Sequence, residues 1–342
     1  MHPIVNLVIG LAVAIGPAAA AADSQPALYP HEEMNHWGRW GQDDERGAAN
    51  FITPAAIVKA AGLIRSGRTF SLAIPLDQTG PVYPPRLLPH HTMTVTGADY
   101  AADPSLAPFG PSTMRFADDY IYMALQGSSQ WDGLSHAWYG NKLYNGFPQS
   151  VVRSAPTAGG ATRLGIENVK DGLVGSGVLI DVVRFKGGKL PPGYGITRAD
   201  LEGALKAQGS TVRSGDIVIV RTGRLPLWYA LKTAAEREEF LSGPKAGLTS
   251  DVVPWIREHE IAGVAADSMA MEQIPNQFDE ELFVPLHGNL LRDLGVYIGE
   301  IWWLEELAAD CAEDERYEFF LAAQPLNITG AVGSPVNPIA IK

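Results

Sequence analysis

One short stretch of the chain gathers side chains that hydrolytic chemistry uses. Residues 125–136, LQGSSQWDGLSH, contain two carboxamides, an acid and an imidazole, namely Gln126, Gln130, Asp132 and His136. On an extended segment, side chains two and four positions apart share one face, so the first three can converge on one point if the segment is a strand. That arrangement suits a metal ion or a polar substrate.

The same stretch resembles a degenerate copy of the H-x-G-T-H-x-D-x-P-x-H signature of the cyclase-like hydrolases, the family of bacterial kynurenine formamidase and isatin hydrolase. Gln126 and Gln130 stand at the positions of two metal-binding histidines, Asp132 matches the metal-bridging aspartate, and His136 matches the last histidine, which transfers protons. The aspartate and the last histidine are retained, whereas both leading histidines are replaced.

Further segments resemble the same family. His287 and Glu300, in HGNLLRDLGVYIGE, resemble its second metal pair, and Tyr83, in PVYP, stands where kynurenine formamidase has a tryptophan beside its substrate. The blocks at residues 36–54 and 330–341 resemble those of a longer branch that is described only as "cyclase family".

The resemblance implies one catalytic α/β domain with the swivelling β/β/α fold, assembled into a homo-oligomer. It implies that Asp132, His287 and Glu300 bind a divalent metal, that Gln130 and Gln126 add neutral oxygen ligands, and that His136 moves the proton. Because oxygen donors favour harder ions, we expect manganese before zinc. The loss of two imidazoles also lowers metal affinity, and a site without metal is the alternative.

Each of these residues also has a purely structural interpretation. Asp132 precedes Gly133 and could organise a turn, His136 could be a core histidine bonded to a backbone carbonyl, and His287 could cap the following helix. The two glutamines could bond neighbouring backbone instead of a cation. Glu300 lies in the apolar run VYIGEIWWL, where a carboxylate is costly unless it is paired or ligated.

Three aromatic residues are candidates to contact the substrate. Tyr83 and Trp37, with Trp40 as an alternative to the latter, could cover an aromatic or cyclic substrate. Trp131 is the third candidate, although its position between Gln130 and Asp132 directs it to the opposite face of a strand, which favours the core.

Composition excludes several classes of partner. The chain has 342 residues, a net charge of -12 and no run of Lys or Arg, which argues against nucleic acid or an anionic membrane and leaves a small molecule as the partner.

Cys311 is the single cysteine, so no intrachain disulfide can form, and the surrounding LEELAADCAEDE predicts a half-buried helical thiol. Motifs for a serine nucleophile, a P-loop, HExxH zinc and dinucleotide binding are absent from the sequence.

The amino terminus predicts export. Residues 4–22 form an apolar, Ala-rich run that ends in small residues, as a signal peptide does. A membrane-anchored helix is the alternative, but Gly10, Gly16 and Pro17 interrupt the run. We therefore expect a signal peptide at 1–22, an N-terminal arm at 23–52, a catalytic domain at 53–342, a periplasmic or secreted protein, and no stable membrane insertion after cleavage.

Local patterns predict alternating strands and helices. Thr53 and Pro54 begin a helix that Gly67 should end, Thr197 and Asp200 form a capping box, and another helix begins near Ser250. The expected strands are residues 69–75, 119–125 (which would lead directly into the motif), 178–185, 216–223 and 261–267. This alternation indicates an α/β domain.

The leading functional hypothesis is hydrolysis of a small cyclic or aromatic amide, lactam, lactone or ester, similar to arylformamidase activity, by metal-activated water with His136 as proton shuttle. One alternative is a metal-free acid-base enzyme of the same fold that catalyses lactonisation or elimination. The other is a periplasmic small-molecule binding protein that has lost its chemistry.

Overall fold

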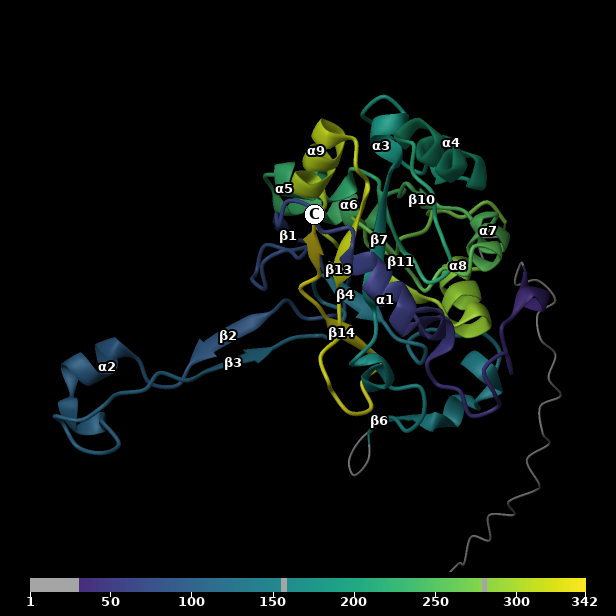
Figure 1. Ribbon diagram of the computed structural model, residues 1–342. Helices are drawn as coiled ribbons and strands as arrows, with labels where there is room; N and C mark the ends of the chain where they lie inside the picture. Colours follow the sequence, from purple (N-terminus) through teal and green to yellow (C-terminus); the bar gives the residue numbers. More distant parts are fainter. Residues whose placement is uncertain (1–30, 155–158, 279–281) are drawn as a thin grey trace, which may run out of the picture.

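A single large sheet runs through the body of the protein. The computed structural model describes residues 31–154, 159–278 and 282–342, and within them this curled sheet has nine strands in the order β1-β15-β13-β7-β9-β11-β12-β4-β14 (Figure 1). Its four central strands are parallel: β7 (Val174–Asp181), β9 (Ile217–Arg221), β11 (Gly263–Ala266) and β12 (Tyr297–Glu300).

Antiparallel strands extend both sides of this parallel centre. On one side lie β13 (Glu318–Ala322), β15 (Ile339–Ile341) and β1 (Thr69–Ser71), and on the other lie β4 (Gln130–Asp132) and β14 (Gly333–Pro335). The predicted α/β class is therefore confirmed. The central strands are largely buried on both faces, which fits the apolar sequences of β7, β9 and β11.

Helices cover the sheet and carry the chain between its strands. They are α1 (Pro54–Ala61), α3 (Val182–Phe185), α4 (Arg198–Gln208), α5 (Arg224–Ala230), α6 (Ala234–Ser242), α7 (Val252–Glu258), α8 (Pro285–His287), the π-helical turn η7 (Gly288–Leu294) and α9 (Glu305–Asp314). Smaller elements are η1 (Glu32–Met34), η2 (Gly47–Phe51), η4 (Tyr144–Gly146), η5 (Gln149–Val151), η6 (Ile166–Val169), and the strand pairs β5 (Val152–Arg153) with β6 (Gly160–Ala161) and β8 (Gly195–Ile196) with β10 (Gly247–Leu248).

Most predicted helix starts are confirmed. The Thr53 side chain accepts a hydrogen bond from the Ala56 amide at the start of α1, and Thr197 forms the expected capping box at α4. The third helix begins at Val252, two positions after Ser250. The predicted end of α1 at Gly67 is wrong, because α1 stops at Ala61 and residues 62–68 lead to β1, with the Gly67 amide bonded to the Lys342 carbonyl.

Three strand predictions were clearly too long, and the first of them, 69–75, ends at Ser71. Predicted strand 178–185 ends at Asp181, whose side chain accepts a hydrogen bond from the Arg184 amide and so starts α3. Predicted strand 119–125 ends at Tyr122 and does not lead directly into the motif: β3 (Asp119–Tyr122) pairs with β2 (His90–Met93) in a separate two-stranded sheet.

These two strands belong to a segment that leaves the body. Residues 88–124, here called the projecting hairpin, run out along β2, pass through α2 (Gly97–Ala102) and η3 (Pro104–Leu106), and return along β3 (Figure 1). The N-terminal arm behaves differently, since its described part packs on the body: the Ala48 amide bonds the Gly295 carbonyl, and Phe51 joins the main core.

The predicted signal peptide, residues 1–22, lies outside the described residues. Among the described residues, no helix combines the length and the apolarity needed to cross a bilayer.

Candidate active site

The pairing of β4 with β12 brings three polar side chains to one face of the sheet. Asp132 lies opposite Ile298 and Gln130 lies opposite Glu300 in this antiparallel pair. Residues two apart on a strand and residues directly opposite on neighbouring strands share a face, so Gln130, Asp132 and Glu300 meet there. All three are buried.

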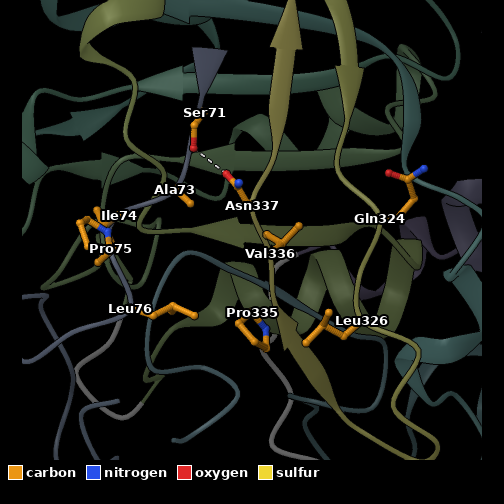
Figure 2. Close-up of a pocket in the computed structure, with 10 residues that line it drawn as sticks. All are labelled: Ser71, Ala73, Ile74, Pro75, Leu76, Gln324, Leu326, Pro335, Val336 and Asn337. Atoms are coloured by element: carbon orange, nitrogen blue, oxygen red, sulfur yellow. Dashed lines mark hydrogen bonds between the residues drawn. The ribbon is translucent and has the colours of Figure 1, made fainter. Parts of the chain in front are cut away.

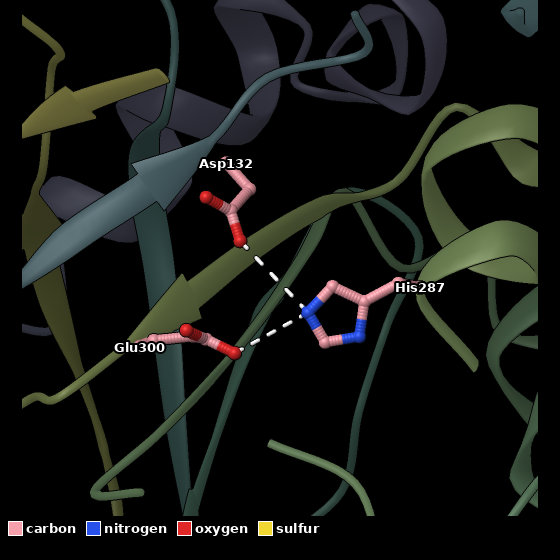
Figure 3. A group of neighbouring side chains, drawn as sticks. All are labelled: Asp132, His287 and Glu300. Carbon is pink, nitrogen blue, oxygen red and sulfur yellow. Dashed lines mark ion pairs between the residues drawn. The ribbon is translucent and has the colours of Figure 1, made fainter. Parts of the chain in front are cut away.

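His287 reaches the same point from the end of α8 (Figure 3). Its Nε2 lies 3.3 Å from Oε1 of Glu300 and 4.0 Å from Oδ2 of Asp132. One potential ligand atom from each of the three residues falls within 4.8 Å of the other two. The structure thus joins residues that stand far apart in the sequence.

Gln130 orients the two carboxylates. Its Nε2 donates to Oδ1 of Asp132 at 3.3 Å and to Oε2 of Glu300 at 3.2 Å. Each carboxylate therefore uses one oxygen to accept from the amide, while its other oxygen faces His287. The amide nitrogen, not the oxygen, faces the acids, so the predicted role of Gln130 as an oxygen ligand does not match this arrangement.

Glu272 holds the other side of the His287 ring. Its carboxylate lies 2.5 Å from Nδ1 of His287 and also accepts from the backbone amides of Leu286 and His287, at 3.0 and 3.1 Å. When Nδ1 carries the proton that Glu272 accepts, the lone pair of Nε2 points at Glu300 and Asp132. This is the arrangement in which a carboxylate fixes a metal-binding imidazole.

Burial and neighbouring charges perturb both titrating groups at the centre. Burial raises the pKa of Asp132, and the charge of Glu300 raises it further, against the opposing effect of His136, His287 and Arg86. For His287, burial lowers the pKa, but the neighbouring carboxylates of Glu272 and Glu300 outweigh it and leave the pKa well above its ordinary value.

The donor set fits a divalent cation. Two carboxylate oxygens and one imidazole nitrogen converge, and Oε1 of Glu300 is buried without a hydrogen-bond donor among the described residues. Converging acceptors of this kind need a shared positive charge, either a proton on Nε2 of His287 or a metal ion. One imidazole and two carboxylates suit an ion that accepts both oxygen and nitrogen ligands.

These residues line a cavity of about 380 Å³. His136 stands at its wall, with Nε2 3.6 Å from Oδ1 of Asp132, and its side chain is 19% exposed whereas that of Asp132 is 1% exposed. His136 is therefore the member of the group with the best access to solvent, as a group that exchanges protons with water must be. The remaining wall is formed mainly by Tyr83, Pro84, Pro85, Arg86, Ala270, Ile274, Phe283 and Val284.

Tyr83 is the one aromatic candidate that lines this cavity. Its hydroxyl donates to the Leu241 carbonyl at 3.0 Å, and the ammonium of Lys245 lies 5.0 Å from the centre of its ring. These contacts fix the ring as part of the wall.

The structure places the other two aromatic candidates elsewhere. Trp131 is fully buried on the opposite face of β4, where its indole donates to the Ala323 carbonyl and packs edge-on against Trp302, so it is a core residue. Trp37 lies against the Arg292 guanidinium and donates to its carbonyl, in a different cavity. Neither can contact a substrate in the cavity of its own chain that holds Asp132.

Gln126 does not line the cavity either. It precedes β4, and its Nε2 is buried beside Gly333 without a hydrogen-bond partner in the described part of the chain. The amide packs beside Gly333 of β14, so this arrangement does not place it as a metal ligand.

The structural alternatives fare differently at each residue. His287 precedes η7 but makes no side-chain capping bond, and no backbone carbonyl bonds the His136 ring within residues 31–154, 159–278 and 282–342. Arg221, at the end of β9, forms ion pairs with Asp181 and Glu305. Cys311 lies on α9 as predicted but is fully buried, and burial raises its thiol pKa to about 12.

Sequence reasoning assigned no role to two residues of the site. Glu272 follows β11, where parallel strands end and α/β proteins place their ligand loops, and this position is a usable signal. Arg86 lines the cavity with one guanidinium nitrogen 3.5 Å from the Gln126 carbonyl, and none of the ion pairs found in the described residues involves it. Nothing in the local sequence marks Arg86.

Comparison with known proteins confirms the predicted cyclase-type fold. The family described as "Putative cyclase" matches residues 70–273. A crystal structure described as a novel cyclase is 64% identical, with a TM-score of 0.87 over 92% of this chain and 100% of that one. No curated protein matches the chain.

Two more distant structures share the fold. Isatin hydrolase A from Labrenzia aggregata, bound to benzyl benzoate, has a TM-score of 0.55 at 18% identity, over 82% of this chain and 94% of that one. Isatin hydrolase A from Ralstonia solanacearum has a TM-score of 0.54 at 17% identity, over 83% of this chain and 94% of that one.

Proposed function

The chain belongs to the cyclase family, and from that premise we propose that it is a hydrolase of a small cyclic or aromatic amide, lactam, lactone or ester. The observation that carries the proposal is the convergence of Asp132, His287 and Glu300 in one cavity with His136. The hydrolases that share this fold support it. An arylformamidase-like preference is the narrowest form of the proposal.

Asp132, His287 and Glu300 would hold a divalent metal, with manganese preferred to zinc because two of the three donors are carboxylates. Such an ion supplies a Lewis acid that polarises a carbonyl group and lowers the pKa of water towards neutrality. Gln130 and Glu272 keep the three donors aligned by the hydrogen bonds described above.

His136 delivers a proton to the leaving nitrogen or oxygen. It faces the same cavity as the metal ligands and is close enough to Asp132 for the carboxylate to orient its ring. Tyr83 forms one wall for a ring, and Arg86 offers guanidinium N–H groups to a carbonyl or carboxylate of the substrate. A cavity of about 380 Å³ suits a small molecule.

The test begins with metal removal and return. The purified protein is stripped with a chelator, reloaded with manganese or zinc, and assayed on aryl formamides, lactams, lactones and esters. We expect activity to disappear with the metal and to return most fully with manganese. Activity that is indifferent to both treatments contradicts the metal proposal, and tight binding of a compound without turnover contradicts the hydrolase proposal.

A metal-free enzyme of the same fold is the second candidate, and the raised pKa of His287 favours it. A proton shared among His287, Glu272 and Glu300 balances the buried charge without an ion. Elemental analysis of protein purified without chelator separates the two candidates, because the metal-dependent enzyme retains about one ion per chain whereas the metal-free enzyme retains none.

We also propose export to the periplasm or beyond, with cleavage of residues 1–22. The support is the apolar, Ala-rich sequence of residues 4–22. The mass of the protein recovered from the periplasmic fraction tests this directly, since an uncleaved chain would contradict it.

A further inference from the structure

The cavity that holds Asp132 contains a cation outside the converging donor set. Arg86 lines the cavity and is half-buried, and the ion pairs formed within the described residues do not include it. One of its guanidinium nitrogens lies 3.5 Å from the Gln126 carbonyl. Burial raises the pKa of Asp132, and Arg86 is among the charges that lower it, so the field of Arg86 reaches the centre of the site.

Two buried cations, Arg224 and Lys245, stand behind the Tyr83 wall of the cavity and are here called the wall cations. The Lys245 ammonium lies 5.0 Å from the centre of the Tyr83 ring. Burial raises the pKa of Tyr83, whereas the charge of Arg224 lowers it. Two other buried cations, Arg292 and Lys342, have acid partners, but no ion pair of the described residues involves a wall cation.

Backbone carbonyls at the end of α6 hold the wall cations. Lys245 donates to the Leu241 and Gly243 carbonyls, at 2.7 and 3.2 Å. Arg224 donates to the Phe240 carbonyl at 2.9 Å. Burial lowers the pKa of Lys245 to about 8, so the ammonium is the main form at pH 7. Carbonyl dipoles at a helix C-terminus stabilise positive charge without cancelling it, so this wall keeps a positive potential.

The negative charges of the site have partners of their own. A divalent ion held by Asp132, His287 and Glu300 carries the two charges that offset those of the carboxylates. Glu272 lies on the far side of the His287 ring, where it faces Nδ1 and two backbone amides. Arg86 and the wall cations are then left without a counter-charge, which an anionic substrate supplies.

A four-residue turn fixes Arg86 relative to the Tyr83 ring. The Arg86 amide donates to the Tyr83 carbonyl at 2.9 Å, and the two residues between them are prolines, whose rings restrict the backbone φ angle. Both side chains line the cavity. A flat ring that packs on Tyr83 therefore presents its substituents to the guanidinium in a defined geometry.

The larger groove on the body has the opposite character. Its volume is about 550 Å³, it lies beside β1 and β14, and none of the ten residues that line it is ionisable (Figure 2). Leu76 and Leu326 are 46% and 53% exposed there, and the Ser71 hydroxyl bonds the Asn337 side chain at 2.6 Å. A charged ligand finds no counter-charge among these residues, so the cavity with Arg86 is the one suited to an anion.

We propose that the substrate is an anion, namely an aromatic or cyclic amide, lactam, lactone or ester whose ring carries a carboxylate that Arg86 binds while the ring lies against Tyr83. This inference rests on the proposed function, because it names the substrate class of the same site. An arginine holds a carboxylate through two parallel N–H donors, whereas an uncharged substituent forms weaker bonds. Arg86 is thus a specificity-determining residue.

Paired substrates provide the first test. The ortho, meta and para isomers of formamidobenzoate carry a ring carboxylate, and formanilide is the same ring without it. For the native enzyme, we expect kcat/KM to be roughly 10- to 100-fold higher for the best isomer than for formanilide, the range that a hydrogen bond to a charged group contributes. Arg86→Gln should bring this ratio close to one, and Arg86→Lys should restore part of it.

Arg65→Gln, at an exposed arginine between α1 and β1, is the matched control and should keep the native ratio. Any loss that both compounds share cancels in the ratio, so a general loss of activity does not imitate a change in specificity. A native ratio at or below one overturns the proposal. An Arg86→Gln ratio equal to the native one also overturns it, because Arg86 then serves a group that both compounds share.

Binding separates this proposal from the proposed function. Calorimetric titration with benzoate and with benzamide compares a charged and an uncharged ligand of similar size without turnover. We expect the native protein to bind benzoate more tightly, and Arg86→Gln to lose most of that advantage. An advantage that survives in Arg86→Gln overturns the proposal, because the carboxylate then binds elsewhere, such as at a metal ion. If the advantage depends on Arg86 but no compound is hydrolysed, the hydrolase proposal fails and the anion site stands.

Discussion

The buried site and the projecting hairpin are made from neighbouring stretches of chain, yet they are determined in opposite ways. Asp132 lies on a strand with neighbours on both sides, and each of its two carboxylate oxygens faces a different group, Gln130 or His287. Tyr120, ten residues from Gln130, lies on a strand with one neighbour and an exposed side chain. The buried charges are held by groups of the same chain, whereas the apolar side chains of the hairpin are left exposed by the described residues.

The packing around β4 leaves little freedom. Gly333 lies opposite Asp132 on β14, and a Cβ at this position would stand 2.4 Å from Nε2 of Gln126 and 2.7 Å from the Trp131 carbonyl. Glycine is therefore required where the two strands and the Gln126 amide meet. No comparable constraint acts on the hairpin stem, whose side chains face solvent.

The largest expected effect is that of Asp132→Asn. It removes one of two converging carboxylate charges, so we expect the metal to be lost and kcat/KM to fall by roughly 1000-fold or more. Steady-state kinetics and elemental analysis measure both quantities. Asp43→Asn, at a side chain that is 93% exposed, is the control. Full activity of Asp132→Asn would show that the buried cluster is structural.

His136→Ala should reduce kcat by on the order of 100-fold, because general acid-base catalysis usually contributes that much. Metal content should stay unchanged, since His136 is not among the three converging residues. His259→Ala, which removes a ring bonded to the Trp255 carbonyl outside the cavity, is the matched variant. A folded His136→Ala protein with native kcat would rule out the proton-shuttle role.

Asp293→Asn should change how stability depends on pH. Burial raises the Asp293 pKa to about 6, although hydrogen bonds from Tyr139 and Asn289 and the charge of Arg292 lower it. From about pH 4 to pH 6, the folded chain therefore holds a proton that the unfolded chain has lost. The native carboxylate thus stabilises the fold less as pH rises through 6.

Between pH 4 and pH 7, the folding equilibrium constant of the native chain should fall by up to about 100-fold relative to that of the asparagine variant. This factor corresponds to a pKa raised by about two units. Urea unfolding of both proteins at each pH measures this difference. Parallel curves for the two proteins would mean that Asp293 is not perturbed in the folded state.

Glu272→Gln should weaken metal binding by about 10- to 100-fold while sparing the fold, because Glu272 orients His287 and does not converge with the three ligand residues. Competition with a chelating dye measures the affinity. Saturating metal should restore most of kcat, which distinguishes a positioning residue from a ligand. Glu258→Gln, at a side chain that is 51% exposed, serves as the comparison.

Much of the scaffold could be predicted because its signals are local. Strands β7, β9 and β11 are apolar on both faces, and the pair Thr197 and Asp200 marks the start of α4. Asp132, His287 and Glu300 were identified through family motifs, and the sheet then brought them together. Their individual roles stay predictions.

The rest depends on contacts that no local pattern encodes. Gln130 could be named, but whether its oxygen or its nitrogen faces the acids depends on Glu300, which lies 170 residues away. Glu272 becomes relevant only when the loop after β11 returns to α8. The sequence did not predict the hairpin, because its Pro- and Gly-rich middle suggests only turns.

The smallest expected effect concerns whether the buried site depends on the projecting hairpin. If the buried site is determined by the body of the chain, then the variant with Tyr120→Ser and Tyr122→Ser should keep its metal and retain kcat within about threefold, because the hydrogen bonds of Gln130 and Glu272 remain. Any change in KM should exceed the change in kcat, since Tyr83 and Arg86 lie on the segment that leads into the hairpin, whereas the three converging residues lie elsewhere. Steady-state kinetics and elemental analysis of both proteins measure these quantities. Complete loss of activity in a folded variant would mean that the site depends on the hairpin, and the division between a self-contained site and an exposed hairpin would fail.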